Sequence, residues 1–316
     1  MKGRLFIICI MAAALCFQVN AEPMKWVEFG VPYESLKYAM DVDISTAEKE
    51  KHISWIDILA VAACRTGGTC PLDSVKKASK ALEGDNDVEE ILGDLYKYYP
   101  YYKESFLAVL GGLLGSFTIE KNGEVIADYG LKAYSPIAAG YGYSHSDDFG
   151  NRRTFGFARK HLGHDMMGAL STPIVAVEGG IVEAMGWNRY GGWRIGIRSN
   201  DNKRYYYYAH LQKDHPYADG LEVGDVVQAG DLIGFMGRTG YSDKENVNNI
   251  EVVHLHFGIQ LIFDESQKEC LSEIWIDPYH IVRLLHNHRS TLQKTESGWR
   301  RVYPFVDLDI ESYPNE

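Results

Sequence analysis

Five side chains in this sequence are of the types that hold or serve a catalytic metal ion. They lie in three short strings, His161-Leu-Gly-His-Asp165, Tyr-Tyr-Ala-His210-Leu and His254-Leu-His256. A catalytic zinc site takes three protein ligands from histidine and carboxylate side chains and keeps one position open for water. Together the strings supply three such ligands and two further imidazoles, so the sequence indicates a metal-dependent hydrolytic site.

The string that contains His254 and His256 has the pattern of a β-strand. Apolar and non-apolar residues alternate from Val253 to Gln260, which is the period of a strand with one buried face. The two imidazoles then project in parallel and can share one metal ion. Alone, such a pair is more often an ordinary surface feature, so the assignment depends on the other strings.

His161 and Asp165 are four residues apart, a spacing that puts both side chains on one face. Gly163 favours a loop or extended conformation there. An imidazole with a carboxylate is a suitable ligand set for zinc. His164 points differently if the segment is extended, and we expect it to be a bystander or to support the ligands.

His210 ends a strand-like run of tyrosines, at the point where the chain turns. A histidine in that position suits a general base or a hydrogen-bond donor to a developing oxyanion. The remaining histidines, among them His145, are expected to be ordinary surface or core residues.

The first 21 residues have the features of a secretory signal. Lys2 and Arg4 precede the apolar run Leu5–Phe17, and Val19-Asn-Ala21 offers small side chains at a cleavage position. This run of about thirteen apolar residues is too short to span a bilayer. We therefore expect a secreted protein of the cell envelope, in the periplasm or the extracellular cell wall, with no stable membrane span after cleavage.

The charge of the chain excludes one class of partner. Loss of Lys2 and Arg4 with the signal would change the formal net charge from −11 to −13. Nucleic-acid binding needs clustered basic residues, so no nucleic acid is expected.

Three cysteines remain after cleavage of the signal. Of these, Cys64 and Cys70 could form a disulfide or be buried thiols, with Cys270 left over.

The elements that must position these residues fall into two regions. The pattern is helical from about Ser35 to Leu114, with Tyr99-Pro-Tyr101 expected as a turn and Asp73 and Asp87 as helix N-caps. From Thr118 it changes to short strands, beginning with a hairpin that turns at Asn122-Gly123. The predicted class is α+β and multidomain, an N-terminal α-helical domain followed by a mostly antiparallel β-sheet domain. The expected divisions are a signal peptide (1–21), a helical domain (22–117), a connecting and site-flanking segment (118–154), a domain that carries the metal site (155–285) and a C-terminal tail (286–316).

Residues 155–285 resemble the lysostaphin/LytM-type zinc metallopeptidase family, which has a duplicated hybrid motif fold. The motifs that carry the resemblance are His161-Leu-Gly-His-Asp165, Ser171-Thr-Pro-Ile-Val-Ala176, Gly180-Ile-Val182, Tyr208-Ala-His-Leu211, Val223–Gly234, Gly237-Arg-Thr-Gly240 and His254-Leu-His-Phe257. The resemblance implies one zinc ion per chain, bound by His161, Asp165 and His256. It also implies that His210 and His254 are catalytic, one assisting the attacking water and one steadying the tetrahedral intermediate. The implied substrate is the peptide of bacterial peptidoglycan, cut by an endopeptidase.

Two features leave the reading of function open. The polar segment 243–253 is longer than is usual in the family and is expected to form a loop at the rim of the groove, where it would affect specificity. The helical domain could dock a protein partner, restrain activity or bind glycan.

The alternative function is a catalytically silent or latent relative that acts as a scaffold or activator in cell-wall remodelling. A lipoyl- or biotin-carrier module, suggested by Val223–Gly230, would leave the histidines unexplained.

Overall fold

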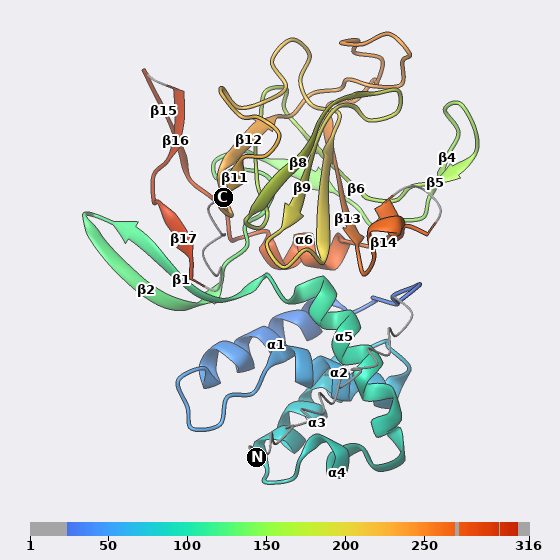
Figure 1. Ribbon diagram of the computed structural model, residues 1–316, viewed down its shortest axis with the longest axis vertical. Helices are drawn as coiled ribbons and strands as arrows, with labels where there is room; N and C mark the ends of the chain where they lie inside the picture. The colour runs from blue at the N-terminus through green and yellow to red at the C-terminus, as the bar shows by residue number, and fades with distance from the viewer. Residues whose placement is uncertain (1–23, 269–271, 297, 309–316) are drawn as a thin grey trace, which may run out of the picture.

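The computed structural model describes residues 24–268, 272–296 and 298–308. A helical region and a β domain lie against each other, with the helices below the sheet in Figure 1. This arrangement confirms the predicted α+β class. The signal predicted at 1–21 and Cys270 lie outside the described residues. Within those residues, no helix combines the length and apolar character needed to cross a membrane.

The helical region is built around one fully packed helix, α2. Its helices are α1 (Tyr33–Thr46), α2 (Trp55–Thr66), α3 (Leu72–Glu83), α4 (Val88–Leu92), the 3-10 turn η1 (Gly93–Tyr98) and α5 (Tyr99–Leu110). Seven consecutive positions are apolar in α2, from Ile58 to Cys64, and all but one of its first ten residues are buried. Its neighbours α1, α3 and α5 therefore surround it on several sides.

Helix boundaries follow the capping residues only in part. Asp87 forms the predicted N-cap of α4 and makes a reciprocal capping box with Glu90. The prediction for Asp73 was wrong, because the N-cap of α3 is Pro71 and the helix begins at Leu72. The turn predicted at Tyr99-Pro-Tyr101 was also wrong. Pro100 lies in the first turn of α5, where its missing N–H costs no helical hydrogen bond.

The β domain contains one large antiparallel sheet, which carries the site. Its strands run in the order β11-β8-β9-β10-β13-β6-β3, and β14 pairs with β13. The strands are β3 (Tyr143–His145), β6 (His164–Gly168), β8 (Gly180–Asn188), β9 (Gly192–Ser199), β10 (Arg204–Ala209), β11 (Val226–Val227), β13 (His254–Leu261) and β14 (Ile274–Ile276). Strands β7 (Pro173–Val175) and β12 (Leu232–Phe235) form a second pair. The alternation predicted from Val253 to Gln260 thus becomes β13, near the middle of the sheet.

Smaller hairpins flank this sheet. Strands β1 (Leu114–Lys121) and β2 (Glu124–Leu131) turn at Asn122 and Gly123, whose φ values of 56° and 81° suit a two-residue hairpin turn. Strand β17 (Phe305–Asp307) pairs with β1, and β15 (Leu292–Thr295) pairs with β16 (Gly298–Arg301). The segment 118–154 and the tail 286–316 thus contain paired strands. A further short hairpin, β4 (Arg152–Arg153) with β5 (Arg159–Lys160), stands beside the site.

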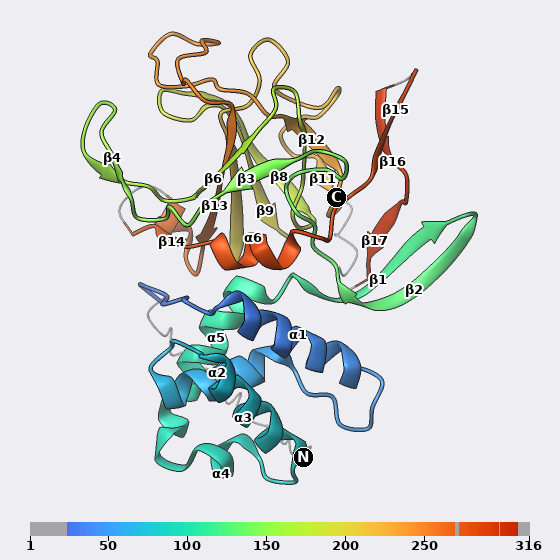
Figure 2. The same ribbon diagram turned by 180° about the vertical axis from the view of Figure 1, so that it is seen from behind.

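Contacts of two arginine side chains join the two regions. Arg204 of β10 is fully buried and bonds Glu178 through Nε at 2.8 Å and Nη2 at 3.0 Å. Its Nη1 donates to the carbonyl of Ala108 in α5 at 2.7 Å. A second contact joins α6 (Tyr279–Leu285) to α1, because Arg283 Nη2 lies 3.5 Å from Glu34 Oε1. Helix α6 lies along the edge of the β domain that faces α1 (Figure 2). The sheet is therefore anchored at its base to the helices.

Candidate metal centre

Strand register brings together residues that are far apart in sequence. On the two sides of β13, His256 pairs with Asp165 of β6 and with Ala209 of β10. His210 follows Ala209 directly, and His161 lies in the loop that leads into β6. This loop conformation agrees with the expectation from Gly163. The five predicted side chains therefore meet on one face of the sheet.

Three of their atoms form a compact triangle. His161 Nε2 lies 2.8 Å from His256 Nδ1 and 3.0 Å from Asp165 Oδ1, and the latter two atoms are 3.1 Å apart. Two imidazoles and one carboxylate are the donors that a catalytic zinc uses. Among the described residues, this is the group of histidine, cysteine and carboxylate side chains that could hold a metal ion. The donor set therefore fits a single Zn²⁺.

A carboxylate behind the triangle orients His161. His161 Nδ1 lies 3.1 Å from the carbonyl oxygen of Asp148 and 3.2 Å from its Oδ2. Since these oxygens only accept, Nδ1 carries the hydrogen, and in the neutral ring Nε2 is left with its lone pair facing the triangle. Such partners fix the orientation of metal-binding histidines and make them better donors.

The β4–β5 hairpin contributes a cation to the site. Arg153 Nη2 donates to Asp165 Oδ2 at 2.8 Å and to Asp148 Oδ2 at 3.0 Å. It occupies the carboxylate oxygen of Asp165 that faces away from the two histidines. Oδ1 is therefore the oxygen left to serve as a ligand.

His210 and His254 lie beside the triangle with their free nitrogens available. Their rings are 4.7 Å apart, and His254 Nε2 is 3.8 Å from Asp165 Oδ1. His210 Nδ1 donates to the carbonyl of Thr239, and His254 Nδ1 donates to that of Val252, each at 2.9 Å. Both Nε2 atoms are thus unprotonated in the neutral rings and can accept a proton.

The backbone of His210 is in a conformation that non-glycine residues seldom adopt. Its φ is 61°, in the left-handed region. Hydrogen bonds hold it there, since its N–H bonds the carbonyl of Gly191 at 2.7 Å and its carbonyl accepts from Gly237 N–H at 3.1 Å. Residues of this kind cost about 1–3 kcal/mol and cluster at functional sites.

The ionisation of the site suits a cation and a base. Burial alone would raise the pKa of Asp165, but hydrogen bonds from His161 and His256 lower it overall. Burial would lower the pKa of His161, but hydrogen bonds to the neighbouring carboxylates raise it to about 9. The pKa of His210 lies well below its usual value because the ring is buried and faces two other imidazoles. His210 is therefore neutral at neutral pH.

Glycine at 163 has a second role besides loop conformation. A Cβ there would lie 2.5 Å from Cε1 and 2.6 Å from Nε2 of His256, and 2.9 Å from the carbonyl oxygen of Phe257. A side chain at this position would collide with the ring of a predicted ligand. The glycine lets the His161–Asp165 loop approach β13 closely enough to complete the triangle.

Sequence reasoning missed three supporting residues. Asp148 and Arg153 were counted only as part of a flanking segment, and His145 was expected to be ordinary. His145 Nδ1 is 2.7 Å from Nε2 of the fully buried His164, behind β6. His164 does point away from Asp165, as expected for an extended strand. These contacts depend on how 145–160 folds back, and no spacing in a single sequence reports that.

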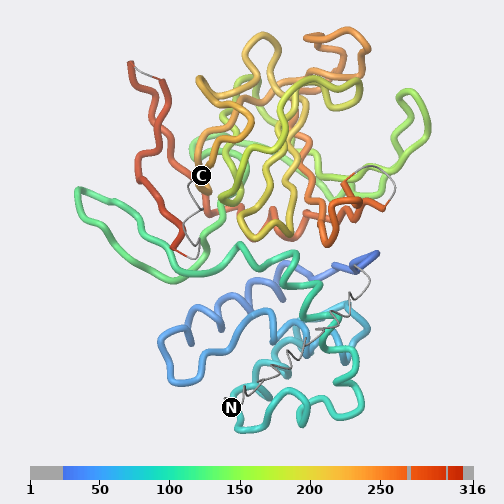
Figure 3. The backbone as a smooth tube through the Cα atoms, in the orientation of Figure 1, coloured from blue at the N-terminus to red at the C-terminus, as the bar shows by residue number. Residues whose placement is uncertain are grey.

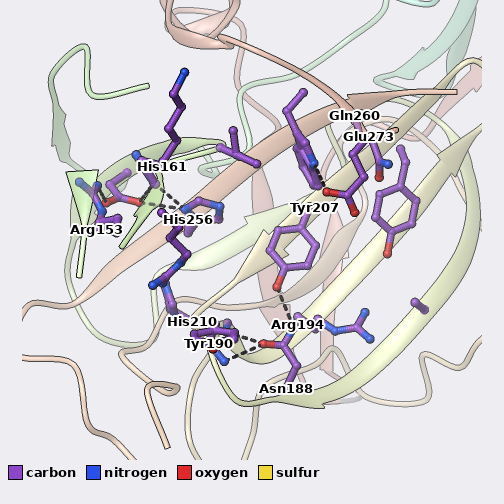
Figure 4. A pocket seen from close by; sticks show the side chains of 18 of the residues that line it. Arg153, His161, Asn188, Tyr190, Arg194, Tyr207, His210, His256, Gln260 and Glu273 are labelled. Carbon is purple, nitrogen blue, oxygen red and sulfur yellow. Dashed lines mark hydrogen bonds and ion pairs between the residues drawn. The ribbon is translucent and has the colours of Figure 1, made fainter. Parts of the chain in front are cut away.

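A cleft opens beside the triangle along the sheet (Figure 4). Its volume is about 620 Å³, and its lining includes all five predicted side chains. Tyr207 and Tyr190 line it too, and Asn188 Nδ2 donates to Tyr207 Oη at 3.0 Å. The loop between β12 and β13, which includes 243–253, lies at the end of the β domain away from the helices (Figure 3). Tyr241 of this loop reaches the cleft.

The similarity to known proteins lies in the part of the chain that carries the candidate metal centre. Peptidase family M23 matches residues 159–268. The L-Ala–D-Glu endopeptidase of Bacillus subtilis is 38% identical over 132 residues, which are 42% of this chain and 39% of that protein. Lysostaphin of Staphylococcus simulans is 38% identical over 98 residues, 31% of this chain and 17% of that protein. The chain thus spans less than half the length of these curated relatives.

Among solved structures, one neighbour aligns with more of this chain than its β-sheet domain. It is a candidate glycyl-glycine endopeptidase, lytM, from Ruminococcus gnavus, 25% identical, with a TM-score of 0.54. The alignment covers 82% of this chain and 89% of that one, so it extends beyond the segment matched by the family. The chain is therefore similar to peptidase family M23 through residues 159–268, which carry the histidine and aspartate motifs of the site.

Proposed function

We propose that this protein is a zinc-dependent endopeptidase that hydrolyses peptide cross-links of bacterial peptidoglycan. The observation that carries the proposal is the triangle of His161 Nε2, Asp165 Oδ1 and His256 Nδ1, with sides of 2.8–3.1 Å. One matched relative is named as an L-Ala–D-Glu endopeptidase, and the structural neighbour is named as a candidate glycyl-glycine endopeptidase. The predicted signal at 1–21 agrees with a substrate in the cell wall.

The proposed roles follow from the geometry of the side chains. His161, Asp165 and His256 would hold the zinc ion, which when bound lowers the pKa of a water molecule and polarises a carbonyl group. His210 is neutral and presents a free Nε2, so it suits the residue that takes the proton from the attacking water. His254 Nε2, beside it, would donate a hydrogen bond to the oxyanion of the scissile carbonyl once protonated.

The cleft gives the substrate a place to bind. It runs from the triangle across β10 to β9, over a floor of tyrosine side chains. An extended peptide lying along it would place one carbonyl group at the triangle and its neighbouring side chains over Tyr207 and beyond. Binding energy along the cleft would then orient the scissile bond.

The test is digestion of purified peptidoglycan of several cross-link types by the zinc-loaded protein, with release of new amino groups as the readout. Wild type should release them, and His210→Ala should lose at least about a hundredfold in rate, the scale of a lost general base. Arg300→Gln, an exposed change on β16 far from the cleft, is the control for handling. A wild type that binds zinc but releases no amino groups from any wall type would favour the scaffold alternative.

A further inference from the structure

Arg194 is a cation in the cleft that has no partner in the described part of the chain. It lies on β9, lines the cleft and is half-buried, and its Nε is buried without a hydrogen bond. Two other arginines of the sheet are paired at 2.8 Å, Arg198 of β9 with Glu183 and Arg204 of β10 with Glu178. A guanidinium left unpaired in a partly buried site carries a desolvation cost, which an anionic ligand would remove.

We propose that Arg194 binds a carboxylate of the substrate peptide close to the scissile bond, so that the protein selects wall peptides with an acidic residue there. This inference rests on the proposed function and deepens it. Guanidinium groups bind carboxylates through two parallel hydrogen bonds, which gives both affinity and orientation. The ligand class is therefore a peptide with a free carboxylate.

The register of the sheet sets the distance from Arg194 to the triangle. Ile195 pairs with Tyr208, which places Arg194 at the level of Ala209, and Ala209 pairs with His256. Adjacent strands are about 4.8 Å apart, so the backbones of β9 and β13 are separated by roughly 10 Å at this level. An extended peptide advances about 3.3 Å per residue. Arg194 therefore reaches a group one to three residues from a carbonyl held at the triangle.

The space around Arg194 is open on the cleft side. In Figure 4, Tyr207 of β10 lies between His256 and Arg194. On the other side, Gly186 of β8 pairs with Arg194, and a Cβ at Gly186 would find no atom within 4 Å. Gly186 therefore puts no side chain over the guanidinium, and the space at this position is open to a ligand.

Of the other charged side chains that line the cleft, all but Lys160 have partners in the described part of the chain. Arg153 bonds Asp165, and Lys268 pairs with Glu183 and Glu265. Arg159 stacks over the rings of Tyr190 and Tyr241, at 4.7 Å and 5.7 Å from their centres. Glu273 accepts a hydrogen bond from Trp275. These pairings leave Arg194 on the floor, and the exposed Lys160 at the rim, to meet a substrate anion.

The test compares two stem peptides that differ in one group. Both contain D-glutamate, in one with a free α-carboxylate and in the other with that group as the primary amide. Wild type should favour the carboxylate peptide in kcat/KM by about ten- to a hundredfold, the effect of a hydrogen bond to a charged group. In Arg194→Gln the ratio should fall to near one, and Arg194→Lys should keep part of it. Arg300→Gln, the matched control, should keep the full ratio.

A binding measurement separates failure of the inference from failure of the proposed function. Dissociation constants for both peptides are measured on the folded, zinc-loaded protein, in a His210→Ala background if wild type cleaves them. A tenfold preference that Arg194→Gln abolishes supports the inference even if wild type cleaves neither peptide. The inference is overturned if Arg194→Gln weakens the binding of both peptides equally, so that the ratio of their dissociation constants is unchanged. It is also overturned if that ratio is one in wild type. The inference is overturned as well if Lys160→Gln abolishes the preference for the carboxylate peptide and Arg194→Gln keeps it.

Discussion

Replacing Gly163 with alanine is expected to weaken zinc binding while the fold of the β domain remains. The new Cβ would lie 2.5 Å from Cε1 and 2.6 Å from Nε2 of His256, where ordinary contacts begin at 3.4 Å. The new Cβ would also lie 2.9 Å from the carbonyl oxygen of Phe257, so it cannot move away from the ring in that direction. Either the imidazole or the loop must therefore move by about 0.9 Å.

This displacement is large for a metal site and small for a fold. Metal–ligand distances hold within about 0.2 Å, so the shift exceeds that tolerance several times over. We expect zinc affinity to fall by at least about tenfold, as when a supporting residue is lost. One extra methyl in a packed interior costs about 1–3 kcal/mol, which corresponds to a decrease of roughly 2–10 °C in the Tm of the metal-free protein.

The assay is competition for zinc with a chromophoric chelator, together with thermal unfolding of the metal-free protein. Gly142→Ala is the matched control, because a Cβ at Gly142 meets no atom within 4 Å and its φ is not in the left-handed region. That variant should bind zinc like wild type. The reasoning would be refuted if Gly163→Ala bound zinc within twofold of wild type, since the ring contact would then not limit the site.

Three further predictions concern other contacts. Asp148→Ala should weaken zinc binding by about ten- to a hundredfold, because His161 loses the carboxylate that orients it; unchanged affinity in the chelator assay would contradict this. Burial raises the pKa of Cys64 to about 11 and of Cys70 to about 12, and both are free thiols. Their neutral form therefore persists through pH 8, and peptide-mapped alkylation should be more than about a hundredfold slower in the native than in the unfolded protein; equal rates would show that they are accessible. Arg204→Met should destabilise the protein by about 3–5 kcal/mol in a denaturant titration, since Glu178 is left buried and unpaired; a loss below about 1 kcal/mol would show that the contact matters little.

The sequence predicted the parts of the site that depend on local periodicity. Alternation over 253–260 placed His254 and His256 on one face, and Gly163 indicated a loop before β6. The turn at Asn122-Gly123 was predictable for the same reason, because positive φ values there favour these two residues. Each of these features is decided by a few neighbouring residues.

What the sequence left out depends on contacts between distant segments. Asp148 and Arg153 reach the site because 145–160 folds over β6, and neither has a fixed spacing from a ligand. The partnership of Arg204 with Ala108 spans nearly a hundred residues and joins two regions with different patterns. At Pro100, the local rule for a turn lost to the tolerance of a helix for proline in its first turn.

The zinc content per chain tests the central assignment most directly. Wild type, His161→Ala and His210→Ala are loaded with zinc, dialysed against metal-free buffer and measured by elemental mass spectrometry against protein concentration. We predict about one zinc per chain in wild type and in His210→Ala, and almost none in His161→Ala, since three ligands are needed to hold the ion. Retention of zinc by His161→Ala, or its loss from His210→Ala, would contradict the division between metal ligands and catalytic histidines.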